Sequence, residues 1–462
     1  MFKSEIYSTR REKLKKNLSS GLILIPGNTE ASYNYPANTY HFRQDSDFLY
    51  FFGLDAPDLA GVMDVDTGED YIFGNDVDMD DIIWMGPQPT LHERALKVGV
   101  KNTSPFSALD GAIQDALLKG KEIHILPPYR GKNILLLERL FNKAQGEIKK
   151  MVSEELVKEV IALRSVKENV EIEEIEMAME TAFEMHTTAM RMAMPGVVER
   201  EISGAIEGIA LSKGTGVSFP IILSIHGETL HNHYHGNTLE TGRMMVTDAG
   251  AESLLHYASD ITRTVPVGGK FDPRQKEIYE VVLKANVEAI QRIKPGEMYK
   301  SIHLDAARII AQGMKDLGLM RGDIMEAVSQ GAHALFFPHG LGHMMGLDVH
   351  DMEGLGENNV GYDQEVTRSD QFGLAFLRLG RRLEQGFVLT VEPGVYFIPA
   401  LIDQWRSENK FKDFINYDRV DLYKDFGGIR IEDDVLVTAD GYRILGQPIP
   451  KTVAEIEQIM TT

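Results

Sequence analysis

The chain contains no cysteine among its 462 residues. Disulfide bonds and thiolate metal sites are therefore excluded, so any metal ion must be held by carboxylates and imidazoles. Donors of this kind favour hard or borderline divalent cations. With 69 acidic residues and 14 histidines in the chain, a single Asp or His carries little information, and only its sequence context can single it out.

An excess of positive charge is also missing. The 48 basic residues are outnumbered by the acidic ones, and the formal net charge is -21 at pH 7. A chain with this charge is poorly suited to electrostatic binding of nucleic acid or of anionic lipid. We therefore expect neither a nucleic acid nor a membrane as its partner.

Long apolar runs are the third absence. The first residues, MFKSEIYSTRREKLKKNL, carry charges where a signal peptide needs its apolar core. No later stretch offers about twenty uninterrupted apolar residues, the length that a membrane-spanning helix needs. We therefore expect a cytoplasmic protein.

The length predicts two or three domains, at roughly 100 to 200 residues each. The first third mixes short apolar segments such as GLILIPG with turn-rich connections, and GVMDVDTGEDYIFG is typical of a hairpin that turns at Asp66-Thr67-Gly68. From about Glu154 the pattern changes to long helical segments, which then alternate with strand-like ones. We expect an α/β domain over residues 1–155 and an α+β domain over residues 156–462.

Four carboxylates stand in apolar, strand-like segments, where an unpaired charge is costly. They are Asp248 in RMMVTD, Asp260 in HYASDITRTVPV, Glu392 in FVLTVEPGVYF and Glu432 in GGIRIEDDVLV. Each one alone would be interpreted as a carboxylate that caps a turn or pairs with a nearby cation. All four together are compatible if a bound cation neutralises them, because like charges packed together raise one another's pKa. The pattern predicts a metal site.

Two further features accompany the carboxylates. Residues 338–351, PHGLGHMMGLDVHD, place His339, His343 and His350 among glycines, and from these residues alone it stays open which of them contacts a metal or a substrate. In GIRIEDD, the alternation of a strand puts Arg430 on the same face as Glu432. Arg430 can thus balance the ligand carboxylates from behind, although a purely structural ion pair would give the same pattern.

Taken together, the motifs TDAGAE, ASDITRT, HGLGHMMGLDVHD, TVEPG and IRIEDD resemble the five-ligand site of the proline-specific metallopeptidases, aminopeptidase P and prolidase. They follow the family's order between residues 247 and 434. The stretch FRQDSDFLYFFGLDAPDLAGVMDVDTG is similar to the N-terminal domain of the same group, so the resemblance spans nearly the whole chain. It implies an α+β catalytic domain of the pita-bread fold, with internal pseudo-twofold symmetry, after a smaller α/β N-terminal domain.

The resemblance also implies a dinuclear metal site. Its five ligands would be Asp248, Asp260, His343, Glu392 and Glu432, with Asp260 and Glu432 bridging the two divalent ions. Manganese is the usual ion in aminopeptidase P, and Co²⁺ or Zn²⁺ also suits these donors. In the mechanism so implied, a metal-bridging hydroxide attacks the scissile carbonyl, and Glu392 carries the proton to the leaving proline nitrogen.

Histidines outside the ligand set match substrate contacts of the family. His339 and His350 match two of them, and His350 together with one metal would stabilise the oxyanion. A further catalytic histidine lies in LHNHYHGN. His231 is preferred because its distance along the chain from the first ligand is that of aminopeptidase P, and His233, which a tyrosine follows, stays open as the alternative. His235 is interpreted as solvent-facing or structural.

The substrate pocket must accept a pyrrolidine ring, because the bond before proline is a tertiary amide without N–H. We expect His339 and Tyr396 to line it. Arg378, in FLRLGRRLEQG, aligns with the arginine that binds the C-terminal carboxylate of dipeptides in prolidase, and Arg381 and Arg382 are close competitors. Long connections on both sides of Glu392 also resemble prolidase.

We therefore expect an Xaa-Pro aminopeptidase that releases the N-terminal residue from small proline-containing peptides and also cleaves dipeptides. A strict Xaa-Pro dipeptidase, a prolidase, is the alternative. An inactive binding protein on the same fold is the alternative of another class, and the complete ligand set argues against it. A methionine aminopeptidase fits poorly because of the large additional N-terminal domain. The resemblance also implies a homodimer or a higher homo-oligomer.

Overall fold

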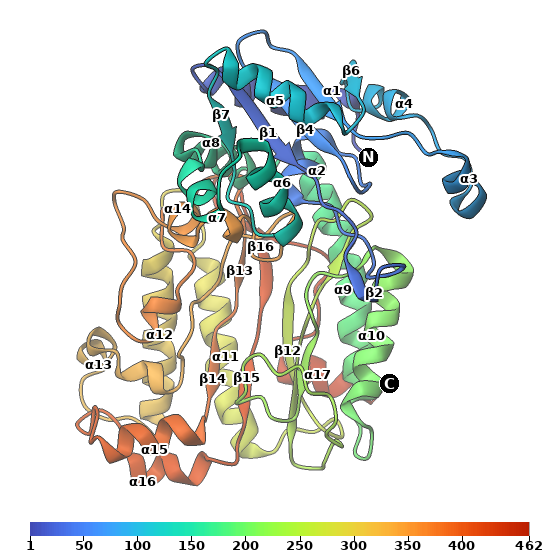
Figure 1. Ribbon diagram of the computed structural model, residues 1–462. Coiled ribbons are helices and arrows are strands. Elements are labelled where there is room, and N and C mark those ends of the chain that lie inside the picture. Colours follow the sequence, from blue (N-terminus) through green and yellow to red (C-terminus); the bar gives the residue numbers. More distant parts are fainter. Residues whose placement is uncertain (462) are drawn as a thin grey trace. The chain divides into compact units, whose positions relative to one another are not determined.

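A computed structural model describes residues 1–461 (Figure 1). The chain divides into two compact units, the first of which ends at Arg164 and the second of which begins at Ser165. The division falls after residue 164, whereas the sequence pattern placed it after residue 155. Helix α8 (Glu154–Ser165) accounts for the difference, because Arg164 pairs with Asp47 at 2.6 Å and so attaches the end of the helix to the first unit.

The first unit is an α/β domain built on one five-stranded sheet, with strand order β6-β5-β4-β1-β7. Strand β1 pairs antiparallel with β4 and parallel with β7, and the β4–β5 hairpin turns where the sequence predicted. Its elements are α1 (Ser4–Asn17), β1 (Leu22–Pro26), β2 (Ser32–Tyr35), β3 (Asn38–Thr39), α2 (Ser46–Phe52), β4 (Ala60–Asp64), β5 (Asp70–Phe73), α3 (Met79–Met85), α4 (Leu91–Leu96), β6 (Asn102–Ser104), α5 (Ala108–Leu118), β7 (Ile123–Ile125), α6 (Gly131–Phe141), α7 (Gln145–Ile148) and α8.

The second unit combines long helices with small antiparallel sheets, of strand order β12-β10-β9 and β13-β16-β17, and the pairs β14–β15 and β11–β8. Its elements are α9 (Asn169–Met192), α10 (Glu199–Lys213), β8 (Gly216–Val217), β9 (Ile222–Ser224), β10 (Met244–Ala249), β11 (Ala251–Glu252), β12 (Ile261–Pro266), α11 (Pro273–Gln291), α12 (Tyr299–Asp316), α13 (Ile324–Gln330), α14 (Glu357–Gly361), β13 (Val388–Val391), β14 (Gly394–Tyr396), α15 (Pro399–Ser407), α16 (Tyr417–Val420), β15 (Gly428–Arg430), β16 (Asp433–Val437), β17 (Tyr442–Ile444) and α17 (Val453–Ile459).

The second unit repeats one arrangement. A long helix, a Pro-Gly turn and a second helix occur twice, as α9–α10 and as α11–α12, and the turn glycines Gly196 and Gly296 have φ of 91° and 87°. Helix α9 packs on β10 and β12, and α11 packs on β13, β14 and β15, so each half pairs a helix hairpin with strands (Figure 1). Such a repeat is what internal pseudo-twofold symmetry predicts.

The four strands of the second unit that contain or directly adjoin the expected carboxylate ligands are deeply buried. Every residue of β10, β12, β13 and β16 is buried. Strands buried on both faces have near-continuous apolar sequences, which explains why the carboxylates in them stood out.

A buried arginine holds two of these strands together. Arg263 of β12 pairs with Asp433 of β16 at 2.7 Å and also donates to the carbonyl oxygens of Glu432 and Ile449. Lys451 reaches the other oxygen of Asp433 at 2.6 Å. The side chain of Arg263 is 2% exposed, so these bonds act in a poorly hydrated environment, where they are strong. They fix the ends of β12 and β16 relative to each other.

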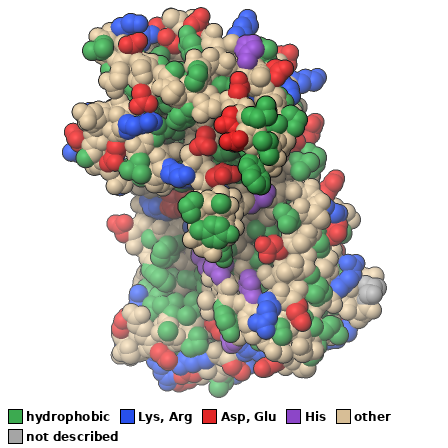
Figure 2. Space-filling view, turned by 45° about the vertical axis from the view of Figure 1, so that its right-hand side comes forward, with side chains coloured by type: hydrophobic (Ala, Val, Ile, Leu, Met, Phe, Trp, Pro, Cys, Tyr) green, Lys and Arg blue, Asp and Glu red, His purple; other side chains and the backbone are tan. Residues whose placement is uncertain are grey.

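Two surface features bear on the expected partners. On the face shown in Figure 2, Lys and Arg side chains are scattered among Asp and Glu and form no extended basic patch. Within residues 1–461, no helix is both long enough and apolar enough to cross a bilayer.

Candidate metal centre and substrate pocket

Five expected ligands from distant parts of the sequence meet in one pocket of about 490 Å³. Asp248 lies in β10, and Asp260 directly precedes β12. Glu392 stands between β13 and β14, and Glu432 between β15 and β16. His343 comes from the glycine-rich loop before residue 351. The structure thus brings together all five residues that the motifs singled out.

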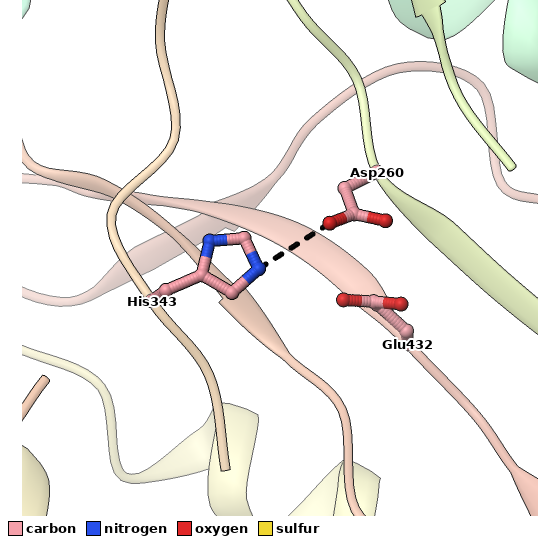
Figure 3. A group of neighbouring side chains, drawn as sticks. All are labelled: Asp260, His343 and Glu432. Atoms are coloured by element: carbon pink, nitrogen blue, oxygen red, sulfur yellow. Dashed lines mark ion pairs between the residues drawn. The ribbon is translucent and has the colours of Figure 1, made fainter. Parts of the chain in front are cut away.

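The closest group within the pocket is Asp260, His343 and Glu432 (Figure 3). One donor atom from each lies within 4.8 Å of the other two, and the Nε2 atom of His343 is 3.3 Å from Oδ2 of Asp260. The Nδ1 atom of His343 is 2.9 Å from the carbonyl oxygen of Met344, which can only accept, so Nδ1 carries the hydrogen. Burial lowers the pKa of His343 to about 4, so at neutral pH the ring presents an Nε2 lone pair to a carboxylate.

The carboxylates of the pocket destabilise one another. Burial raises the pKa of Asp260 and of Glu432 well above the ordinary values, and the next cause is a neighbouring carboxylate, Asp248 in the first case and Asp260 in the second. Burial likewise raises the pKa of Glu392 to about 8. Oδ1 of Asp260 is buried without a hydrogen-bond partner among the described residues. An unpartnered carboxylate oxygen, a facing imidazole lone pair and three disfavoured negative charges fit divalent cations.

The glycine-rich loop is fixed by backbone pairing along β13. His343 and Thr390 exchange bonds, from the Thr390 N–H to the His343 carbonyl at 3.0 Å and from the His343 N–H to the Thr390 hydroxyl at 3.2 Å. The N–H of Glu392 donates to the carbonyl of Leu341 at 2.8 Å. A Cβ atom on Gly342 would lie 2.0 Å from the carbonyl oxygen of Thr390, so only glycine allows this approach. The loop glycines thus bring His343 beside Glu392.

Two residues that the sequence analysis missed hold the carboxylates in place. The hydroxyl of Thr262 donates to Glu432 at 2.6 Å, and the backbone N–H of Asp260 donates to Asp434 at 2.9 Å. Thr262 and Asp434 each lie two positions after a ligand, so they share its face of the strand. That spacing was the available signal for both.

Arg430 links the carboxylates to a histidine. It pairs with Asp248 and donates to Tyr396 at 2.8 Å, and the hydroxyl of Tyr396 is 2.9 Å from Nε2 of His339. Nδ1 of His339 faces the carbonyl of Gly340 at 2.7 Å and so carries the hydrogen, and burial lowers the ring's pKa to about 3. Tyr396 therefore accepts from Arg430 and donates to His339.

Tyr396 does not lie where we expected it. The sequence placed it in the lining of the substrate pocket, but its side chain is fully buried and does not line the cavity. Its hydroxyl is bonded to Arg430 and His339, which holds the ring behind the histidine. His339 does line the pocket, as expected.

The histidines of the LHNHYHGN run are placed differently. His231 and His233 both line the pocket, and His235 does not. His233 and His235 both contact the carbonyl oxygen of Ile221, at 3.4 Å and 3.1 Å. Burial lowers the pKa of His231, and the charge of Arg430 acts in the same direction, so this ring lies within reach of the site's charges.

His350 and Arg378 both line the pocket. The ring of His350 meets that of His343 edge to face at 4.2 Å between centroids, and its Nδ1 atom is 2.6 Å from Glu353. Arg381 and Arg382 pair with Glu384 and Glu365 and do not line the pocket. Of these three arginines, only Arg378 reaches the cavity.

Comparison with known proteins gives two family matches and close structural neighbours. Residues 173–439 match metallopeptidase family M24, and residues 7–125 match the aminopeptidase P N-terminal domain. An Xaa-Pro dipeptidase of Homo sapiens is 32% identical over 97% of this chain and 91% of its own length. A probable Xaa-Pro aminopeptidase of Aspergillus fumigatus is 32% identical over 90% of this chain and 88% of its own.

Solved structures of aminopeptidase P from Escherichia coli cover the whole chain. A substituted form in complex with substrate has a TM-score of 0.82 and 28% identity, over 100% of this chain and 98% of that one. A zinc-substituted form in complex with product gives the same TM-score, identity and coverage.

We expect Mn²⁺ to raise the melting temperature (Tm) of the metal-free protein, because cations that bind the clustered carboxylates bind only the folded state. Asp260→Ala and Glu432→Ala should each lose most of this rise and most of the metal measured by atomic absorption. Arg378→Ala, which alters the same pocket without removing an expected ligand, is the control and should keep both. An undiminished rise in Glu432→Ala would mean that the ions bind elsewhere.

Proposed function

Because the chain belongs to metallopeptidase family M24 and is a metallopeptidase of the Xaa-Pro type, we propose that it is an Xaa-Pro aminopeptidase that also cleaves Xaa-Pro dipeptides. The observation that carries this proposal is one pocket that holds five metal-competent residues, four further histidines and two arginines. Relatives that match nearly the whole chain carry both names, dipeptidase and aminopeptidase.

The proposed metal ligands are the five residues that meet in the pocket, with Asp260 and Glu432 shared between two ions. Divalent cations bound there would lower the pKa of a water molecule and polarise the scissile carbonyl. We propose Mn²⁺ as the ion because the donors are carboxylates and one imidazole, and Co²⁺ or Zn²⁺ are the alternatives. Arg430 holds Asp248 from behind and so keeps one carboxylate oriented toward the pocket.

Proton transfer is assigned to Glu392. Its carboxylate is partly open to the pocket, with 18% of the side chain exposed, and Oε1 and Oε2 lie 3.8 Å from His343 and His339. A carboxylate in this position can take a proton from the attacking water and deliver it to the proline nitrogen as the peptide bond breaks.

His350 is assigned to the oxyanion. Glu353 accepts from its Nδ1 atom, which leaves Nε2 as the nitrogen that meets the substrate. A carboxylate on the far side of an imidazole stabilises the doubly protonated ring. Burial lowers the pKa of His350, so Nε2 can donate to negative charge on the carbonyl oxygen once the ring has taken up a second proton.

The proline ring is proposed to contact the apolar part of the lining beside His339. That part consists of Phe219, Pro220, Ile222, Leu230, Pro338, Val349, Phe376 and Ile398. Apolar walls around a few placed polar groups are typical of small-ligand sites.

Arg378 is proposed to favour the shortest substrates. Its Nε atom lies 3.4 Å from Glu353 and 3.7 Å from Glu357, so its charge is already partly balanced. A dipeptide's carboxylate can bind the guanidinium, whereas a longer peptide leaves the arginine to these glutamates. The site therefore does not depend on a substrate carboxylate, and this supports mixed specificity.

We further propose that the protein is a homodimer or a higher homo-oligomer. No residue of helix α3 is buried, and Ile83, Trp84 and Met85 are 69%, 86% and 62% exposed. In Figure 1 this helix stands apart from the sheet of its own unit. A seven-residue helix gains little stability by itself, and exposed apolar side chains that lie together mark interaction surfaces. A second copy of the chain would cover them.

Substrate length tests the proposed specificity. The Mn²⁺-loaded protein should hydrolyse Ala-Pro, Ala-Pro-Ala and a longer Xaa-Pro peptide. Arg378→Ala should raise KM for Ala-Pro by about tenfold or more, the loss of a charge-assisted hydrogen bond, and change KM for Ala-Pro-Ala by less than about twofold. Arg381→Ala is the matched control. Hydrolysis confined to Ala-Pro and lost in Arg378→Ala would identify a strict dipeptidase, and no hydrolysis at all would favour a binding protein.

The histidine assignments make a kinetic prediction. His350→Ala should lower kcat by about a hundredfold or more and leave metal content unchanged, because an oxyanion donor acts in the transition state. His231→Ala should lower kcat far more than His233→Ala does, since His233 is held by a backbone carbonyl. Equal, mild effects of His231→Ala and His233→Ala would remove the catalytic role from this run.

Light scattering after gel filtration tests the oligomer. Ile83→Glu combined with Trp84→Ser should shift the protein to monomers, because both changes remove exposed apolar surface from α3. Leu118→Ser, a residue that is 85% exposed on α5, is the control and should leave the mass unchanged. An oligomer that withstands the double substitution would place the interface elsewhere.

A further inference from the structure

One carboxylate lies between two residues of the proposed substrate pocket. Oε2 of Glu353 is 2.6 Å from Nδ1 of His350 and 3.4 Å from Nε of Arg378. Neither the metal ligands nor the family motifs account for this glutamate. Its side chain is 36% exposed, so it is not required to fill the core.

The local backbone is bent to present this carboxylate. Met352, directly before Glu353, has φ of 61°, a left-handed conformation that non-glycine residues rarely adopt. The side chain of Met352 is buried and holds the turn in place. The chain then returns so that Glu353 donates its N–H to the carbonyl of His350 at 3.2 Å, and the two side chains meet. Such outliers persist where the surrounding structure determines them.

On one side, Glu353 fixes the ring of His350. The carboxylate accepts from Nδ1, and the ring packs edge to face on that of His343. With Nδ1 bonded to Glu353 and the ring in contact with His343, the ring cannot flip without losing both contacts. Nε2 is left to meet a substrate.

On the other side, Glu353 restrains Arg378. Glu357 lies 3.7 Å from the Nε atom of Arg378 and also pairs with Arg368. Its negative charge is therefore shared between two arginines. A cavity of about 20 Å³, large enough for about one water molecule, lies among these side chains. A substrate carboxylate at Arg378 must therefore compete with Glu353.

We infer that Glu353 is a positioning residue that acts on catalysis through His350 and on substrate length through Arg378. The inference rests on the proposed function. When the carboxylate of a dipeptide pairs with Arg378, Glu353 no longer pairs with the arginine and stays bonded to His350 alone. With a longer peptide, Glu353 stays paired with Arg378 and bonded to His350. The same side chain thus sets how strongly the site prefers the dipeptide.

The inference predicts that one substitution lowers both kcat and KM for the dipeptide but only kcat for the longer peptide. Glu353→Gln, loaded with Mn²⁺, should lower kcat for both Ala-Pro and Ala-Pro-Ala by about tenfold, as loss of an orienting carboxylate does. It should lower KM for Ala-Pro several-fold and leave KM for Ala-Pro-Ala unchanged, because Arg378 is freed. Glu353→Asp should restore part of kcat. Glu384→Gln, an exposed partner of Arg381, is the control and should change neither constant.

A double-mutant cycle separates the two roles. In the Arg378→Ala background, Glu353→Gln should still lower kcat but no longer lower KM for Ala-Pro. Tm and metal content check that each variant is folded and loaded. If the wild type cleaves both peptides but Glu353→Gln leaves kcat or the ratio of the two KM values unchanged, the inference is overturned and the proposed function stands. If the wild type cleaves neither peptide, it is the proposed function that fails.

Discussion

The mutual repulsion of carboxylates packed in an apolar interior is the constraint on which the rest of this structure depends. Burial and like charge together raise the pKa of Asp260 and Glu432 well above the ordinary values. Arg430 is bonded to Asp248 and cannot neutralise the whole cluster. Buried charges that are only partly neutralised reduce the stability of the fold. The carboxylate cluster therefore needs other contacts that hold the fold rigidly and cations that neutralise the remaining charge. An M24 metallopeptidase meets both conditions.

Rigidity comes from bonds between strands that lie far apart in the sequence. Thr262 and Glu432 exchange two contacts, and Arg263 ties the same two strands to Asp433. Because strand ends are fixed in this way, the carboxylates cannot relax outward when no cation is present. The site is therefore preorganised for cations. The repeated helix hairpins stiffen the strands from behind.

The fold class and the family could be predicted from the sequence, and both are confirmed. Apolar segments interrupted by single carboxylates identified the ligand candidates, because burying a charged side chain in an apolar segment is energetically costly.

Three features escaped prediction for physical reasons. Periodicity gives the face of a strand and not the depth of a residue, so Tyr396 was placed in the pocket lining and not behind His339. The end of α8 is fixed by an ion pair between residues that lie far apart in the sequence. Glu353 is placed by a turn at Met352 that no local sequence pattern predicts. The cytoplasmic location, the ion and the oligomer stay predictions.

One hydrogen-bond chain joins the metal side of the pocket to its substrate side. Arg430 bonds Asp248 with one nitrogen and Tyr396 with another, and Tyr396 donates to His339, which lines the cavity. Because Tyr396 receives from a cation, its O–H is a stronger donor to the imidazole than that of an isolated tyrosine. A change in the charge of the carboxylates therefore alters the strength of the hydrogen bond to His339. A change at His339 likewise alters the bonds that Arg430 makes. On the other wall, Glu353 is hydrogen-bonded to His350 and forms an ion pair with Arg378. Each wall thus links charged side chains to a histidine that lines the pocket, so a displacement of one of these groups changes the contacts of the other.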